Sequence, residues 1–92
     1  MSRNPSSFFG RNILAVEGEY LTAASLDREL AILGATVTMA GSCTEAMRAI
    51  ERQQFDLVVM DIRLPDDVSY GIARALRRRG TPFLFVSRDE QP

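Results

Sequence analysis

Four residues with oxygen-bearing side chains stand at or just after the ends of short apolar runs. They are Glu17, Glu19, Asp61 and Ser87. Clustered carboxylates repel one another, so either one takes up a proton or a cation neutralises them. Mg²⁺ suits an all-oxygen cluster, and a carboxylate beside it can attack phosphorus while a serine hydroxyl donates to a phosphoryl oxygen. A single polar residue at a strand end also marks where the chain reaches water, so the prediction of phosphoryl chemistry depends on the joint occurrence.

The hydrophobic pattern predicts that these residues meet. Apolar runs alternate with segments of helical periodicity, in the order β-α-β-α-β-α-β. We expect strands over 13–16, 36–40, 55–60 and 82–87, and helices over 20–33, 43–53 and 69–79. This alternation implies a parallel sheet with right-handed crossovers, in which ligands gather at the carboxyl ends of the strands. Asp61 is therefore expected at the carboxyl end of a buried central strand, with 36–40 at an edge.

Local signals refine this outline. Ser42 and Glu45 have the spacing of a capping box, in which the serine accepts from a free N–H and the glutamate reaches back. Arg77–Arg79 crowd the last turn of a helix, where the dipole favours cations, and we interpret them as a solvated helix end rather than a nucleic-acid site. Asp66–Asp67 read as an acidic turn after Pro65, the alternative being a supplement to a metal site.

The composition is typical of one globular domain. The chain has 92 residues, 46% hydrophobic and 25% charged, with a net charge of -1, which gives no bulk attraction to nucleic acid or membranes. No apolar run approaches the roughly 18–20 residues of a membrane span, and we see no signal peptide. The single cysteine, Cys43, excludes an internal disulfide and a Cys-based zinc site, and it fits a cytoplasmic location. We interpret it as a small packing residue rather than a redox sensor.

Three stretches, ILAVEGEYL, FDLVVMDIRLP and TPFLFVSRD, resemble the CheY-like receiver domain of two-component response regulators. The resemblance covers roughly residues 12–88 and implies a flavodoxin-like three-layer α/β/α fold with a parallel sheet. It implies that Asp61 accepts a phosphoryl group from a histidine kinase or phosphotransfer protein, and that Ser87 is the switch hydroxyl. It also implies a Mg²⁺ site made by Glu17, Asp61 and the backbone carbonyl of Arg63. The protein would then be a signalling switch and not an enzyme.

Three features depart from the family pattern. Gly18 replaces a second metal-binding acid, so we expect weak Mg²⁺ binding that Gly18→Asp should strengthen. The chain has no Lys, whereas the family's fifth strand ends in one, and Arg88 does not match that position. The final helix, strand and helix are absent, so residues 12–92 are expected to form a truncated receiver of four strands and three helices behind a flexible lead-in over 1–11.

These departures leave alternatives open. The strand at 82–87 becomes an open apolar edge, which invites pairing with a partner or a second copy. The loop from Pro65 to Gly71 is about two residues longer than the commonest receiver loop. One hypothesis is a phosphorylation-dependent receiver, and the alternative is a degenerate receiver that acts as a phosphorylation-independent interaction module. A small flavodoxin-like ligand-binding domain or enzyme ranks last because no Gly-rich phosphate loop follows the first strand.

Overall fold

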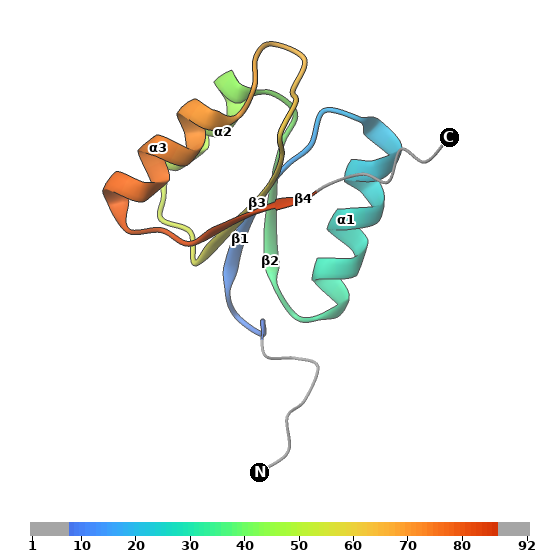
Figure 1. Cartoon of the computed structure of the whole chain (residues 1–92). Helices are drawn as coiled ribbons and strands as arrows, with labels where there is room; N and C mark the ends of the chain where they lie inside the picture. Colours follow the sequence, from blue (N-terminus) through green and yellow to red (C-terminus); the bar gives the residue numbers. More distant parts are fainter. Residues whose placement is uncertain (1–7, 87–92) are drawn as a thin grey trace.

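A computed structural model of the chain describes residues 8–86. These residues form one four-stranded parallel sheet with helices on both faces (Figure 1). The strands are β1 (Asn12–Val16), β2 (Thr36–Ala40), β3 (Leu57–Asp61) and β4 (Phe83–Val86). The helices are α1 (Tyr20–Ile32), α2 (Cys43–Arg52) and α3 (Tyr70–Arg79). The predicted element order and the flavodoxin-like α/β fold class are confirmed, while Ser87, Arg88 and the first seven residues of the predicted lead-in lie outside the described residues.

The sheet order is β2-β1-β3-β4, so the first and third strands of the chain lie at its centre. Residues 13–16 of β1 are completely buried, and residues 58–61 of β3 are buried as well. A strand that is covered on both faces needs apolar side chains at every position, which is why these two segments read as continuous apolar runs. β2 lies at one edge, as its more polar sequence predicts, and β4 forms the other.

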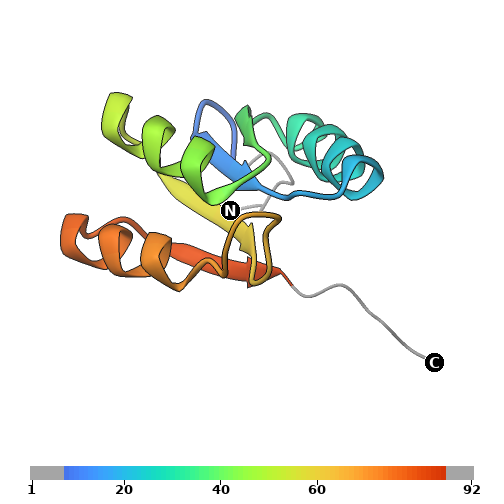
Figure 2. The same ribbon diagram turned by 90° about the horizontal axis from the view of Figure 1, so that it is seen from above.

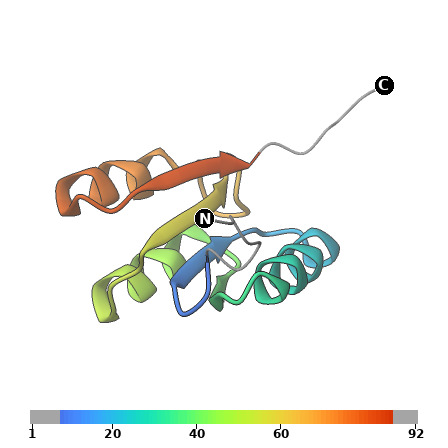
Figure 3. The same ribbon diagram turned by 90° about the horizontal axis from the view of Figure 1, so that it is seen from below.

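The two faces of the sheet have separate hydrophobic cores, because successive strand residues point to opposite faces. α2 and α3 cover one face and α1 covers the other, as the views from above and below show (Figures 2 and 3). Buried strand residues that face α2 and α3 are Leu14, Val16, Ala40, Val58 and Met60. Those that face α1 are Ile13, Ala15 and Val59. None of the helices within residues 8–86 is both long enough and apolar enough to cross a membrane.

β4 is the least covered strand of the sheet. Within residues 8–86 it pairs with β3 alone. Leu84 is 58% exposed and Phe85 is 40% exposed, and the strand alternation points them to opposite faces. The ring of Tyr70, at the start of α3, packs edge-on against Phe85 with 6.1 Å between ring centroids. α1 contacts β1 and β2, so the face of β4 that carries Leu84 has little helix cover.

The predicted capping box at the start of α2 is present in modified form. Ser42 accepts a hydrogen bond from the N–H of Glu45 at 3.1 Å. The Glu45 carboxylate reaches back to the N–H of Gly41, at 2.6 Å, and not to that of Ser42. The reciprocal half of the box is therefore displaced by one residue.

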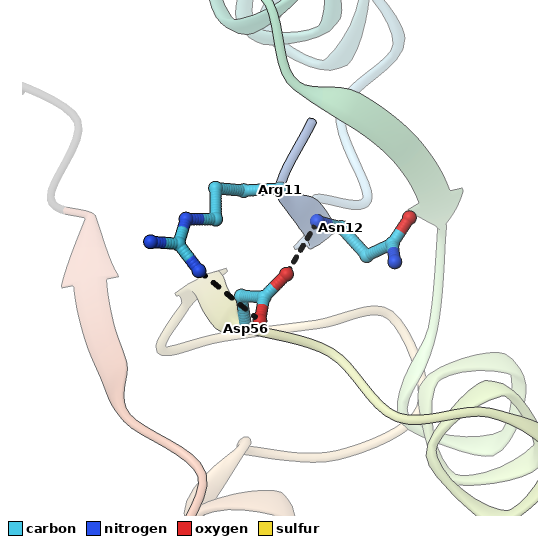
Figure 4. A network of polar contacts seen from close by, with 3 residues as sticks. All are labelled: Arg11, Asn12 and Asp56. Carbon is cyan, nitrogen blue, oxygen red and sulfur yellow. Dashed lines mark hydrogen bonds and ion pairs between the residues drawn. The ribbon is translucent and has the colours of Figure 1, made fainter. Parts of the chain in front are cut away.

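Asp56 joins the beginnings of the two central strands, at the end of the sheet opposite to Asp61 (Figure 4). Its carboxylate accepts from the N–H of Asn12 at 2.8 Å, and its own N–H donates to the Asn12 carbonyl at 2.7 Å. The guanidinium of Arg11 adds an ion pair at 4.0 Å between largely exposed side chains. This polar connection precedes β3, which begins at Leu57 and not at Phe55 as predicted.

We expect Asp56→Ala to lower the free energy of unfolding by about 1 kcal/mol, because the Asn12 N–H loses its hydrogen-bond acceptor. Arg11→Ala removes only an exposed ion pair, so its effect should stay within about 0.5 kcal/mol. Urea unfolding of the two variants beside the wild type measures both values. Equal losses would show that the ion pair, and not the hydrogen bond, joins the strands.

Candidate functional site

The carboxyl ends of β1 and β3 bring two buried acids to neighbouring positions. The register aligns Val16 with Met60, so the next residues, Glu17 and Asp61, lie beside each other on strands that are about 4.8 Å apart. Glu17 is only 4% exposed and Asp61 only 7%. The loops that follow β1, β2 and β3 gather at this end of the sheet (Figure 1). The structure thus brings together two of the candidate residues, while Ser87 lies outside the described part of the chain.

Glu19 belongs to a helix cap. Its Oε1 accepts from the N–H of Thr22 at 3.2 Å and from the Thr22 hydroxyl at 2.8 Å, which is the position of an N-cap side chain. The N–H of Glu19 donates to Oε2 of Glu17 at 3.0 Å. The β1–α1 loop therefore uses one acid to start α1 and holds the carboxylate of the other.

Ser69 is a residue of this site that the sequence analysis missed. It is completely buried, and its hydroxyl lies 2.8 Å from the carbonyl oxygen of Asp61 and 3.2 Å from that of Ile62. Its N–H also donates to the Ile62 carbonyl at 2.8 Å. Ser69 immediately precedes α3 but makes no side-chain cap there. The sequence pattern predicts Ser69 as the first residue of the helix over 69–79, and its role in holding the backbone of Asp61 leaves no separate signal in the sequence.

The segment over 62–69 folds as a short hairpin. Arg63 and Val68 form an antiparallel bridge, and the N–H of Leu64 donates to the Asp67 carbonyl at 2.9 Å. The Arg63 backbone, whose carbonyl is a candidate metal ligand, therefore lies in a paired segment directly after Asp61.

Pro65, at the tip of the hairpin, packs onto Gly18. A Cβ atom at position 18 would lie 2.5 Å from Cδ and 2.8 Å from Cγ of Pro65, and 3.3 Å from the Gly41 carbonyl oxygen. The missing side chain of Gly18 thus makes room for the proline ring. This packing does not support the expectation that Gly18→Asp strengthens Mg²⁺ binding, because an aspartate side chain at position 18 would require the hairpin to move.

Asp66, also at the tip, caps α2 from a distance in the sequence. Its Oδ1 accepts from the N–H of Cys43 at 2.8 Å, and its Oδ2 accepts from the N–H and the hydroxyl of Thr44, both at 3.1 Å. The hydrogen bond from Cys43, followed by those from Thr44, holds the pKa of Asp66 below its ordinary value of 3.8. The interpretation of Asp66 as a simple acidic turn was therefore incomplete.

The thiol of Cys43 is covered by the same hairpin. Its Sγ lies 3.8 Å from the carbonyl oxygen of Asp67 and 3.6 Å from that of Val68. Burial raises the pKa of Cys43, and the carboxylates of Asp66 and Asp67 raise it further. A raised pKa disfavours the reactive thiolate, which agrees with the interpretation of Cys43 as a packing residue.

The oxygen atoms that are expected to hold a divalent cation at the strand ends form a small set. They comprise the carboxylates of Glu17 and Asp61 and the backbone carbonyl of Arg63. Mg²⁺ keeps several waters and commonly binds proteins through one or two carboxylates, so this set fits the ion. It does not amount to a protein cage, since no group of three or more His, Cys, Asp or Glu within residues 8–86 could hold a metal.

Comparison with known proteins agrees with this geometry. Residues 13–92 match the response regulator receiver domain. The chain is 36% identical over 70 residues to the TorCAD operon transcriptional regulatory protein TorR of Escherichia coli (strain K12), a match of 76% of this chain and 30% of TorR. It is 32% identical over 83 residues to the Regulator of RpoS of the same strain, covering 88% of this chain and 25% of that protein. The chain therefore spans less than a third of the length of these relatives.

Solved receiver structures are similar as well. The non-phosphorylated HemR receiver domain from Leptospira biflexa has a TM-score of 0.78 and 30% identity, over 89% of this chain and 68% of that one. The receiver domain of the sensor histidine kinase PA1611 from Pseudomonas aeruginosa PAO1 has a TM-score of 0.79 and 32% identity, over 85% and 67%, and holds a magnesium ion in its active-site cleft. The chain belongs to the response regulator receiver family. This membership confirms the resemblance inferred from the motifs. Members of the family are signalling modules whose general function is phosphoryl acceptance.

We expect Gly18→Ala to lower the free energy of unfolding by about 1–3 kcal/mol, because the added methyl group overlaps the Pro65 ring. In a Pro65→Ala background the ring carbons are gone, and the same substitution should have a much smaller effect. Urea unfolding of the wild type, both single variants and the double variant completes a double-mutant cycle. Additive losses would show that the two residues are not in contact in solution.

Proposed function

We propose that this chain is a phosphorelay receiver in which Asp61 accepts a phosphoryl group from a histidine kinase or phosphotransfer protein. The observation that carries the proposal is the place of Asp61, buried at the carboxyl end of β3 beside Glu17. Family membership supports it, because receiver domains interact with these two classes of donor. The proposal includes a cytoplasmic location, which rests on the single cysteine.

The proposed reaction is a phosphoryl transfer between a phosphohistidine and a carboxylate. A carboxylate oxygen of Asp61 attacks the phosphorus, the bond to the donor's imidazole nitrogen breaks, and an acyl phosphate forms while the donor leaves as histidine. Ser69 holds the Asp61 backbone during this step through its hydroxyl. When bound, Mg²⁺ would offset charge on the phosphoryl oxygens, held by Glu17, Asp61 and the Arg63 carbonyl. Ser87 keeps its proposed role as the hydroxyl that responds to the phosphoryl group.

A degenerate receiver that binds partners without phosphorylation is the second candidate. The contact of Pro65 with Gly18 favours it, since the proline ring fills the space into which a second metal-binding acid would project. The absence of Lys from the chain favours it as well. The two candidates differ in one observable, which is the formation of an acyl phosphate on Asp61.

Incubation with acetyl phosphate and Mg²⁺ should add one phosphoryl group to the wild type, and Asp61→Asn should abolish the adduct because it removes the nucleophile. Intact-mass spectrometry measures both. Asp67→Asn is the matched control, because Asp67 is an exposed acid whose carboxylate bonds the adjacent Val68 N–H, and it should react like the wild type. No adduct on the wild type would contradict the phosphorelay function and leave the interaction module.

We also propose that the outer edge of β4 pairs with the same strand of a second copy. Within residues 8–86 this edge carries no neighbouring strand, and an open edge with exposed apolar side chains such as Leu84 and Phe85 is a template for strand addition. The pairing would also satisfy the backbone N–H and carbonyl groups along the outer edge of β4. It would give the switch a way to change its partner interaction.

Sedimentation velocity over a range of concentrations should therefore show a monomer–dimer equilibrium. Leu84→Glu should shift it to the monomer, because a charged side chain on an edge strand disfavours strand addition. Ile32→Glu is the matched control, since Ile32 is exposed at the end of α1, away from β4, and it should leave the equilibrium unchanged. A wild type that stays monomeric at every concentration would contradict the pairing.

A further inference from the structure

The hairpin over 62–69 connects the candidate phosphorylation site to α2. It starts directly after Asp61, and its two sides are held together by the Arg63–Val68 bridge and by Leu64 and Asp67. At its base, Ser69 binds the carbonyl oxygens of Asp61 and Ile62. The paired sides make the hairpin a continuous connection between its tip and its base.

The tip of the hairpin has a polar anchor at the start of α2. Asp66 receives three hydrogen bonds, two from the first two N–H groups of the helix and one from the Thr44 hydroxyl. Ser42 already serves the next N–H, that of Glu45, as the local cap. Asp66 is thus a second capping group, supplied from another part of the chain, and the helix dipole favours its negative charge.

The neighbouring acid lacks this arrangement. The Asp67 carboxylate accepts from the N–H of the adjacent Val68 at 2.8 Å, a contact within the hairpin that joins it to no other element. The two acids therefore have the same charge and adjacent positions but different connections. This difference makes Asp67 a matched control for Asp66.

We propose that Asp66 is a positioning residue for the Asp61 site. By docking on the amino end of α2, it holds the hairpin in place, with the Pro65 ring against Gly18 and the Arg63 carbonyl two residues after Asp61 in the chain. The inference rests on the proposed phosphoryl acceptance by Asp61. It also assigns α2 a part in the switch, because coupling between two sites is reciprocal: a phosphoryl group that displaces the hairpin must alter the contact of Asp66 with Cys43 and Thr44.

The contact itself is tested by the amide NMR signals of Cys43 and Thr44. In the wild type both should follow one titration with a midpoint below pH 3.8, because the hydrogen-bonded Asp66 carboxylate resists protonation. Asp66→Asn should abolish this titration and Asp67→Asn should preserve it. The other charged side chains around this hollow are Asp67 on the hairpin and Arg48 and Glu51 on α2, and Asp67→Asn controls for the second hairpin carboxylate.

The contact of Asp66 with α2 also affects how the free energy of unfolding depends on pH. The native pKa of Asp66 lies below the unfolded value, so its stabilisation is present above about pH 3.8 and disappears as the pH falls through the native pKa. The difference in unfolding free energy between wild type and Asp66→Asn should therefore shrink over that range.

The positioning role is tested by the rate of adduct formation on Asp61 with acetyl phosphate and Mg²⁺ at pH 7. Asp66→Asn should react about tenfold more slowly, since small displacements of catalytic groups have effects of this size or larger, whereas Asp67→Asn should match the wild type. Phosphorylation of the wild type should also shift the Cys43 and Thr44 amide signals, and Asp61→Asn should show no such shift.

The outcomes separate the two proposals. A wild type that forms the adduct, with Asp66→Asn reacting at the same rate, overturns the positioning role and leaves the proposed function intact. An adduct that leaves both amide signals unmoved overturns the coupling to α2. No adduct on the wild type overturns the proposed function and the positioning role with it, even where the amide titration shows that Asp66 caps α2.

Discussion

The candidate site depends on the parallel pairing of β1 with β3. Both strands are buried on both faces, and a slip of one residue would turn each apolar side chain toward the wrong core. Hydrophobic burial therefore determines the register, and the register places Glu17 beside Asp61. Two carboxylates that would repel one another in isolation are held together by side chains that take no part in the chemistry. Their proximity follows from the packing of the sheet.

The hairpin that follows Asp61 is held by contacts of a different kind. Ser69 anchors its base through backbone carbonyls, Asp66 anchors its tip through helix N–H groups, and Pro65 rests on the open backbone of Gly18. Polar groups decide the direction of the hairpin, and a steric fit decides how closely it approaches β1. The missing acid at position 18 and the proline above it are therefore one structural feature.

Much of the fold was predictable because the relevant signals are local. Buried strands read as apolar runs, helices show their 3.6-residue period, and Asp61 is conspicuous as a carboxylate after an apolar strand. Boundaries were shifted by one or two residues, as where β3 begins at Leu57 after the polar link of Asp56. Glu19 was grouped with the acids at the strand ends, although it caps α1. A carboxylate shortly after a strand can belong to a strand-end site or can cap the next helix. The path of the backbone after β1 decides which of the two roles Glu19 has.

The parts of the site that the sequence did not reveal are contacts between distant segments. Asp66 meets α2 across more than twenty residues of chain, through hydrogen bonds to Cys43 and Thr44, which lie 23 and 22 positions away in the sequence. Gly18 and Pro65, which are also in contact, lie even farther apart in the sequence. The edge position of β4 has a consequence for its backbone amides. It is bonded to β3 on one side only, so its amides should exchange with solvent through local opening far more readily than those of β1 and β3. Such fraying leaves β3 held by β1, and the margin of the sheet can loosen while its centre keeps Asp61 in place.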